Sequence, residues 1–275
     1  MTTMSVIDAA GALSRTFVAD MEALPVGTWE QPCDCTGWTI GGAVIHLCQV
    51  AELLGDSITR GIAGDDGPPP LAATAGIPAW RAHRAEVMKA SLTLPPAELL
   101  EWYRRAVVAL NDATDAIPNA PVEARGWHPV GPRPLAWLLD QWLFELALHD
   151  WDIRVALDPT AEVRAAIRDA FGRTLPARVG RGFSRADDPA LAGRYRVVLT
   201  GDAPYAFVLV VGDGRVEDRP DDGAPADATI RTDPHAFAVV TTNRRPVDTF
   251  EGTDRWRVEG DAARAHAFAR AFSGY

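Results

Sequence analysis

The spacing of apolar residues changes near residue 158, and this change most constrains how the chain can fold. Before it, apolar residues recur with helical period over four long segments, and after it short β-rich runs alternate with turn signals. Four long segments joined by loops predict a helix bundle. The later runs predict a small α+β domain with an antiparallel sheet. We therefore expect an α+β fold of two domains, residues 1–158 and 159–275.

Capping residues and prolines suggest where the helices of the first domain begin and end. Thr39 is a residue type favoured at an N-cap, and Pro95–Pro96 occupies a first helical turn. The stretch 61–78 is rich in Gly and Pro and is expected to be loop, followed by a short helix near 78–90. The four long helices are expected at residues 5–23, 39–60, 95–117 and 135–157.

The second domain is expected to begin with one more helix over residues 161–180. Four strands should follow, separated by the turn signals GDAP, GDG and DDGAPA. Their sequences are RYRVVLT, YAFVLVV, GRVEDRP and DATIRT. Helical spacing then returns at residues 235–241 and 261–272.

Composition narrows the classes of partner. The net charge is −10 and the pI is near 5.1, which argues against non-specific binding to nucleic acid or to an anionic membrane. We find no signal peptide and no apolar run long enough to span a bilayer. Three cysteines in a chain of 275 residues make a disulfide framework an unfavoured reading. We expect a cytoplasmic protein, monomeric or homodimeric, that acts on small molecules.

One apolar segment carries an unusual polar pair. Residues 144–157 read FELALHDWDIRVAL, and in a helix Glu145 and His149 lie four apart and share a face. A carboxylate and an imidazole would then point the same way from a segment that is otherwise apolar. This pattern indicates either an ordinary polar pair or two of the ligands of a metal site.

His46 is the best candidate for a third ligand. It lies in GAVIHLCQV, and its apolar neighbours predict that it points into the bundle, as those of His149 also do. Two imidazoles and one carboxylate would leave a coordination position open, as in catalytic zinc sites. The alternative is that both histidines are ordinary core residues. The other four histidines are expected at the surface: His83, His128, His235 and His266.

Two motifs resemble those of the mycothiol-dependent maleylpyruvate isomerases, which belong to the DinB-like metal-binding bundles. WTIGGAVIHL resembles their W-T-[VI]-x-x-[LV]-x-H-L stretch, and ELALHDWDIRVAL resembles their E-x-x-x-H-x-W-D-x-x-x-A motif. Matched position by position, the resemblance implies metal ligands at His46, Glu145 and His149. The segment from 227 to 272 is similar to the family's small C-terminal domain, which has a sterol-carrier-protein-like fold.

The resemblance also implies the chemistry. Zinc would be the metal and mycothiol the thiol co-substrate, since a zinc-coordinated thiol is deprotonated and nucleophilic. The thiolate could add to an activated double bond, allow rotation and leave, or it could displace a leaving group as in an S-transferase. Two alternatives stay open: a hydrolase that uses zinc-bound hydroxide, and a non-enzymatic carrier of a small ligand.

Several charged residues could assist such a site. Arg154, Arg244 and Arg245 are candidates for binding an acidic substrate, because arginine binds carboxylates bidentately. Asp152 could orient the His149 imidazole, and it is better placed on the helix face than Asp150. Each of these could instead be an ordinary surface charge. We expect the site to open toward the second domain, because domain junctions commonly form ligand pockets.

The remaining motifs have structural readings. Gly41 and Gly42 stand where the family often has an acidic residue, so a capping box is missing. The cysteines are interpreted as structural, because Cys-x-Cys lacks a second pair that would complete a zinc ribbon. They are Cys33, Cys35 and Cys48. The tryptophans at helical positions are expected in or near the core: Trp102, Trp137 and Trp142.

Overall fold

Two compact units make up the chain. The computed structural model describes residues 4–250 and 252–274, and its contacts separate a helical unit, Val6–Ala161, from an α+β unit that begins at Glu162. This confirms the expected α+β class with a helical bundle first. Over the described ranges, no helix combines the length and the apolar character needed to cross a bilayer.

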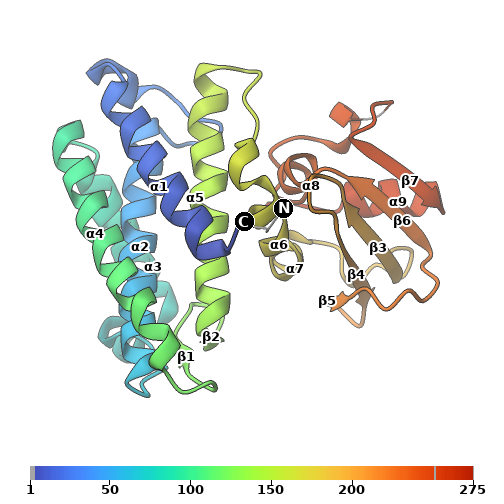
Figure 1. The fold of residues 1–275 in the computed structure, drawn as a ribbon, viewed down its shortest axis with the longest axis horizontal. Helices are drawn as coiled ribbons and strands as arrows, with labels where there is room; N and C mark the ends of the chain where they lie inside the picture. Colours follow the sequence, from blue (N-terminus) through green and yellow to red (C-terminus); the bar gives the residue numbers. More distant parts are fainter. Residues whose placement is uncertain (1–3, 251, 275) are drawn as a thin grey trace. The chain divides into compact units, whose positions relative to one another are not determined.

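Four long helices form the bundle of the helical unit (Figure 1). Helix α2 packs against α4 and α5, and α1 packs against α5 and α4. A fifth helix, α3, contacts α2. The bounds are α1, Val6–Ala23; α2, Ile40–Ile62; α3, Pro70–Ser91; α4, Pro96–Ala116; and α5, Leu135–Leu157.

Aromatic side chains fill the centre of the bundle. The Phe17 and Tyr103 rings lie 5.1 Å apart, and the Trp142 ring is 6.4 Å from Tyr103. All three are buried, and burial raises the pKa of the Tyr103 phenol, which therefore stays protonated. Trp142 is a core residue as expected, whereas Trp102 and Trp137 are half-buried.

The expectation of a loop over residues 61–78 is wrong in its second half. Helix α3 starts at Pro70, and two helical segments meet at a kink where Gly76 has a φ of 83°. Pro78 follows two residues after the kink, in the first turn of the second segment, where a missing N–H is harmless. The prolines of this stretch thus begin helical segments and do not exclude them.

The C-terminal half of α2 lies directly against a two-residue strand, β1 (Arg125–Gly126), which pairs with β2 (Arg133–Pro134). A Cβ atom added at Gly61 would lie 2.3 Å from the backbone oxygen of Arg125. Because this oxygen belongs to the backbone, it cannot move away by rotation of a side chain. Gly61 is therefore required by close packing of main chains.

We expect Gly61→Ala to destabilise the helical unit by about 1–3 kcal/mol, the usual cost of overpacking. Gly11→Ala in α1 is the matched control, because its Cβ would meet only the flexible end of Arg15 at 3.6 Å. That control should gain about 0.5–1 kcal/mol from helix propensity. Urea unfolding measures both values, and equal stability of the two variants would contradict the close approach.

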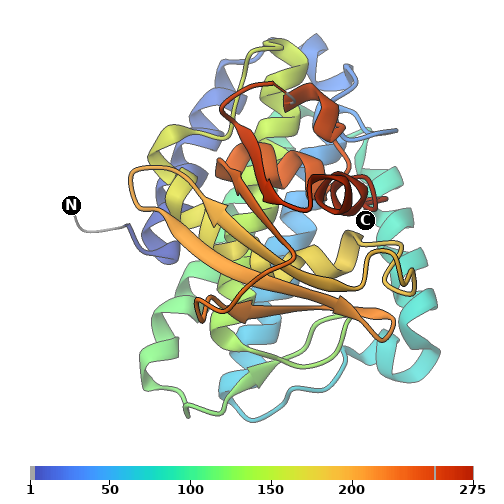
Figure 2. The same cartoon turned by 90° about the vertical axis from the view of Figure 1, so that its right-hand side faces the viewer.

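The α+β unit is built on a five-stranded sheet in the order β5-β4-β3-β6-β7 (Figure 2). The expected antiparallel pairing holds except between β3 and β6, which are parallel. Strand β7 was not expected from the sequence. The bounds are β3, Gly193–Leu199; β4, Tyr205–Gly212; β5, Arg215–Pro220; β6, Ala228–Thr232; and β7, Trp256–Gly260.

Helices cover one face of this sheet. Tyr195 on β3 stacks on Phe268, with ring centroids 4.4 Å apart, and Phe207 on β4 lies 5.8 Å from Phe237. The helix expected over residues 161–180 is instead broken, since Pro176 starts a new helix. The bounds are α6, Arg168–Thr174; α7, Pro176–Gly182; α8, Pro234–Thr241; and α9, Ala262–Ala269.

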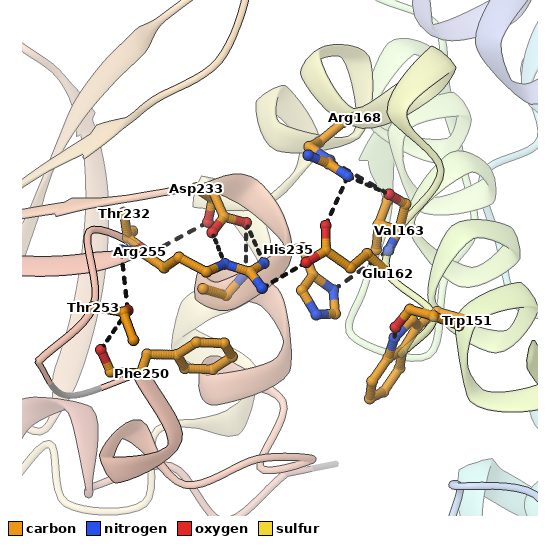
Figure 3. Close-up of polar contacts among 12 residues, drawn as sticks. Trp151, Glu162, Val163, Arg168, Thr232, Asp233, His235, Phe250, Thr253 and Arg255 are labelled. Carbon is orange, nitrogen blue, oxygen red and sulfur yellow. Dashed lines mark hydrogen bonds and ion pairs between the residues drawn. The ribbon is translucent and has the colours of Figure 1, made fainter. Parts of the chain in front are cut away.

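An ion-pair network ties the start of the α+β unit to its sheet, as Figure 3 shows. The Arg255 guanidinium binds Asp233 (Nε to Oδ2, 2.7 Å) and Glu162 (Nη1 to Oε1, 2.6 Å). Glu162 also binds Arg168 at 3.0 Å. Asp233 caps α8 by accepting a hydrogen bond from the Ala236 amide at 3.0 Å. The network is partly buried, so Glu162 is held in a defined place.

Two histidines expected at the surface are in fact buried. His128 lies in a loop but packs edge-on against Trp137, with ring centroids 4.9 Å apart. The Nδ1 atom of His235 accepts a hydrogen bond from the Val163 amide at 3.4 Å (Figure 3). Burial lowers the pKa of His235 to about 4, so this ring is neutral near pH 7. The sequence around His128 and His235 did not predict their burial, because it depends on contacts with Trp137 and Val163, which form only in the folded chain.

Candidate metal centre

A capped helix start sets the position of His46. The Thr39 backbone is extended, and its hydroxyl oxygen accepts a hydrogen bond from the Gly42 amide at 3.1 Å, which makes it the N-cap of α2 as expected. The preceding loop is closed by a hydrogen bond from the Cys33 amide to the Trp38 carbonyl at 3.0 Å. His46 follows about two turns into the helix.

Helix α5 brings Glu145 and His149 toward His46. Helices α2 and α5 lie side by side in the bundle (Figure 1). The Glu145 Oε2 atom is 3.3 Å from His46 Nε2 and 3.4 Å from His149 Nε2. The i, i+4 spacing on α5 and one residue of α2 thus bring three donor atoms together. We refer to His46, Glu145 and His149 as the triad.

An aromatic ring lies against both imidazoles. The Trp38 ring centroid is 4.8 Å from that of His46 and 5.5 Å from that of His149, on which it stacks with an interplanar angle of 17°. The two imidazoles are 4.8 Å apart and nearly perpendicular. Trp38 therefore restricts how either ring can turn.

Hydrogen bonds from neighbouring polar side chains fix two members of the triad. His149 Nδ1 lies 2.9 Å from Asp152 Oδ2, and the Asp152 side chain has no exposed surface. The Gln141 amide donates a short hydrogen bond to Glu145 Oε1. A carboxylate beside Nδ1 favours a proton there, which leaves Nε2 as the ring atom that could lend its lone pair to a metal ion.

The electrostatics of the triad favour an anionic Glu145. Burial raises the pKa of this carboxyl, but contacts with His149 and His46 outweigh it and hold the pKa well below the usual range. Burial lowers the pKa of His46. For His149 burial acts in the same direction, but Asp152 and Glu145 together raise its pKa. The group thus presents a buried negative charge between two imidazoles.

The triad has the donor set of an open zinc site. Its ligand atoms all lie within 4.8 Å of one another, so a single ion could contact all three after small side-chain movements. The exposed fractions of the side chains fall from 23% at His46 to 13% at Glu145 and 6% at His149. The open coordination position should therefore lie on the His46 side.

A second group of potential ligands shares His149. Cys35, His149 and Asp152 also have donor atoms within 4.8 Å of one another. This group lies on the side of the ring that already contacts Asp152, so an ion there would displace that hydrogen bond. All three cysteines are free thiols, and burial raises the pKa of Cys33 to about 12. The triad remains the better candidate because it leaves this support intact.

The arginines expected to bind substrate belong to different units of the chain. Arg154 forms an ion pair with the buried Asp150, four residues earlier on α5, at 2.9 Å. In the other unit, Arg244 and Arg245 are half-buried after α8, and their amides donate to the Val239 carbonyl. Their roles toward a substrate, and the expected opening of the site toward the second domain, stay predictions.

Two residues that contact the triad were not predicted from the sequence. Trp38 was expected only as part of the WTIGGAVIHL motif, and no role was expected for Gln141. Gln141 precedes Glu145 by four positions, so the helical spacing could have found it. Arg84 lies within the helix expected near residues 78–90, but helical spacing alone does not place it against α2.

The fold and this geometry define a two-domain protein whose helical bundle brings two histidines and a glutamate together. Residues 10–154 match the family described as the mycothiol maleylpyruvate isomerase N-terminal domain, and residues 185–273 match the SCP-2 sterol transfer family. The first match spans more than half of the chain. The chain therefore belongs to the mycothiol maleylpyruvate isomerase N-terminal domain family.

Two solved structures match this chain over almost its whole length. A mycothiol-dependent maleylpyruvate isomerase matches with a TM-score of 0.60 and 15% identity, over 94% of this chain and 96% of that one. A histidine-to-alanine mutant of a mycothiol-dependent maleylpyruvate isomerase matches with the same TM-score and coverage at 14% identity. At this identity the likeness concerns the fold. A comparison with curated proteins gives no match.

Proposed function

We propose that this protein is a zinc-dependent enzyme that uses mycothiol to isomerise a small electrophilic substrate. The family assignment supports the thiol, because its name and those of the similar structures contain mycothiol. The meeting of His46 Nε2, Glu145 Oε2 and His149 Nε2 is the observation that carries the proposal. Zinc is the metal best suited to two imidazoles and one carboxylate.

Each surrounding residue has a defined task in this proposal. Asp152 accepts the proton of His149 Nδ1 and so keeps Nε2 turned toward the centre. Gln141 holds the second oxygen of Glu145, and Trp38 covers the two imidazoles. When bound, zinc would supply a Lewis acid that keeps a thiol deprotonated at neutral pH. Because His46 is the most exposed of the three side chains, we place the thiol and the substrate on its side.

Elemental analysis of the purified protein, followed by a mycothiol titration, tests this function. We expect one zinc per chain, a mycothiol-dependent rise in thermal stability, and isomerisation of maleylpyruvate only when mycothiol is present. A mycothiol analogue without its sulfur is the control and should not stabilise the protein comparably. Absence of stoichiometric metal, or turnover that is indifferent to the thiol, would overturn the proposal.

Product analysis separates isomerisation from two related reactions. A product that keeps the thiol would identify an S-transferase, and hydrolysis without added thiol would identify a hydrolase. Recovery of free mycothiol with the trans isomer is the result expected here.

A further inference from the structure

Arg84 of helix α3 is hydrogen-bonded to α2, the helix that carries His46. Arg84 Nη1 donates to the backbone oxygen of Gln49 at 3.2 Å, and Gln49 Nε2 donates to the backbone oxygen of Arg84 at 3.0 Å. Gln49 is three residues after His46 on α2, almost one helical turn. This reciprocal pair therefore ties α3 to α2 at the level of the candidate metal centre.

The Arg84 guanidinium lies over an aromatic ring. Its Cζ atom is 4.9 Å from the centroid of Trp80, and Trp80 packs edge-on against the buried Trp127 at 5.2 Å. A cation–π contact of this kind holds the cation near the ring and leaves its N–H donors available for hydrogen bonds.

Arg84 lacks an ion-pair partner among the residues that the structure describes. Glu145 and Glu52 attract it electrostatically without making a salt bridge, while His46 feels its positive charge. Burial lowers the pKa of Arg84, which indicates a partly desolvated cation. Its Nη1 donates to a backbone oxygen, and a guanidinium has five N–H donors.

We propose that Arg84 recognises a carboxylate of the electrophilic substrate and holds it beside the triad. The planar guanidinium matches a carboxylate in a bidentate manner, and its desolvated setting strengthens the pairing. This inference rests on the proposed function for the nature of the substrate. It assigns the binding of the substrate carboxylate to a residue of α3.

Calorimetric binding of maleate and of its uncharged diamide, maleamide, tests the role of Arg84. Both probes are titrated into metal-free and zinc-loaded protein, because the metal-free arm excludes binding of maleate to zinc alone. We expect the wild type to prefer maleate and Arg84→Gln to weaken maleate binding roughly 10- to 100-fold. Maleamide binding should change by less than about 3-fold, since the uncharged diamide forms no ion pair with the guanidinium.

Two further variants separate recognition from packing. Arg84→Lys keeps the charge and should retain part of the preference for maleate, even if Arg84→Gln fails to fold. Arg81→Gln removes an exposed arginine from the same helix and should bind maleate like the wild type. If the wild type shows no preference, or if both Arg84 variants retain the full preference, Arg84 is a packing residue. If the wild type bound no zinc or no mycothiol but still preferred maleate, the proposed function would be refuted and the role of Arg84 would stand.

Discussion

Alanine in place of His46, Glu145 or His149 is expected to abolish stoichiometric zinc binding and to lower mycothiol-dependent turnover by roughly three orders of magnitude. In the proposed site each side chain would supply one of three protein ligands, so its loss would leave two. The bundle should stay folded, because α2 and α5 keep many other buried apolar side chains. Elemental analysis, steady-state kinetics and circular dichroism measure the three effects.

Matched controls lie on α3. His83→Ala and Glu86→Ala remove the same chemical groups from exposed positions and should leave zinc content and turnover unchanged. A triad variant with full metal occupancy and full turnover would show that the residue is not a ligand. A variant that loses its helical signal would show instead that the residue is needed for folding.

Asp152→Ala is expected to weaken zinc affinity 10- to 100-fold, the usual effect of removing a group that orients a ligand. Without its carboxylate, His149 Nδ1 loses the partner at 2.9 Å that fixes the ring and its protonation. Asp152→Asn keeps a hydrogen-bond acceptor but not the charge, so its affinity should be intermediate. Competition with a zinc-binding dye measures these constants.

The neighbouring Asp150 provides the control for this change. It is also buried on α5, but it pairs with Arg154. Asp150→Ala should therefore lower the free energy of unfolding while zinc affinity stays close to that of the wild type. If both variants weakened zinc equally, the effect would come from general damage to α5.

The ends of a helix could be predicted from the sequence where prolines mark them. The helix expected at residues 135–157 has the same bounds as α5, because Pro134 precedes it and Asp158–Pro159 disfavours its continuation. Prolines were not sufficient evidence around Gly76, since a loop and two short helices joined by a kink share the same Gly and Pro content. Strand β7 was missed because only its pairing with β6 makes it a strand.

The candidate site was predictable to the extent that it depends on one helix. The spacing of Glu145 and His149 places both on one face, and the apolar surroundings of His46 indicated that it points inward. The resemblance of two motifs joined them into one set. Trp38 and Arg84 could not be assigned, because their positions depend on loop closure and on α3, which are tertiary features.

The parallel pair at the middle of the sheet has a consequence for the order in which the α+β unit folds. Strands β3, β4 and β5 are joined by short turns and can pair locally. Strand β3 pairs with β6 only across the two strands that separate them in the sequence, as in the pair of Tyr195 with Ala228. Closing this longer loop costs more chain entropy and slows the step. We expect pulse-labelled hydrogen exchange to protect the amides of β4 before those of β6. Until β6 arrives, one edge of β3 is an open template that could pair with another chain during synthesis.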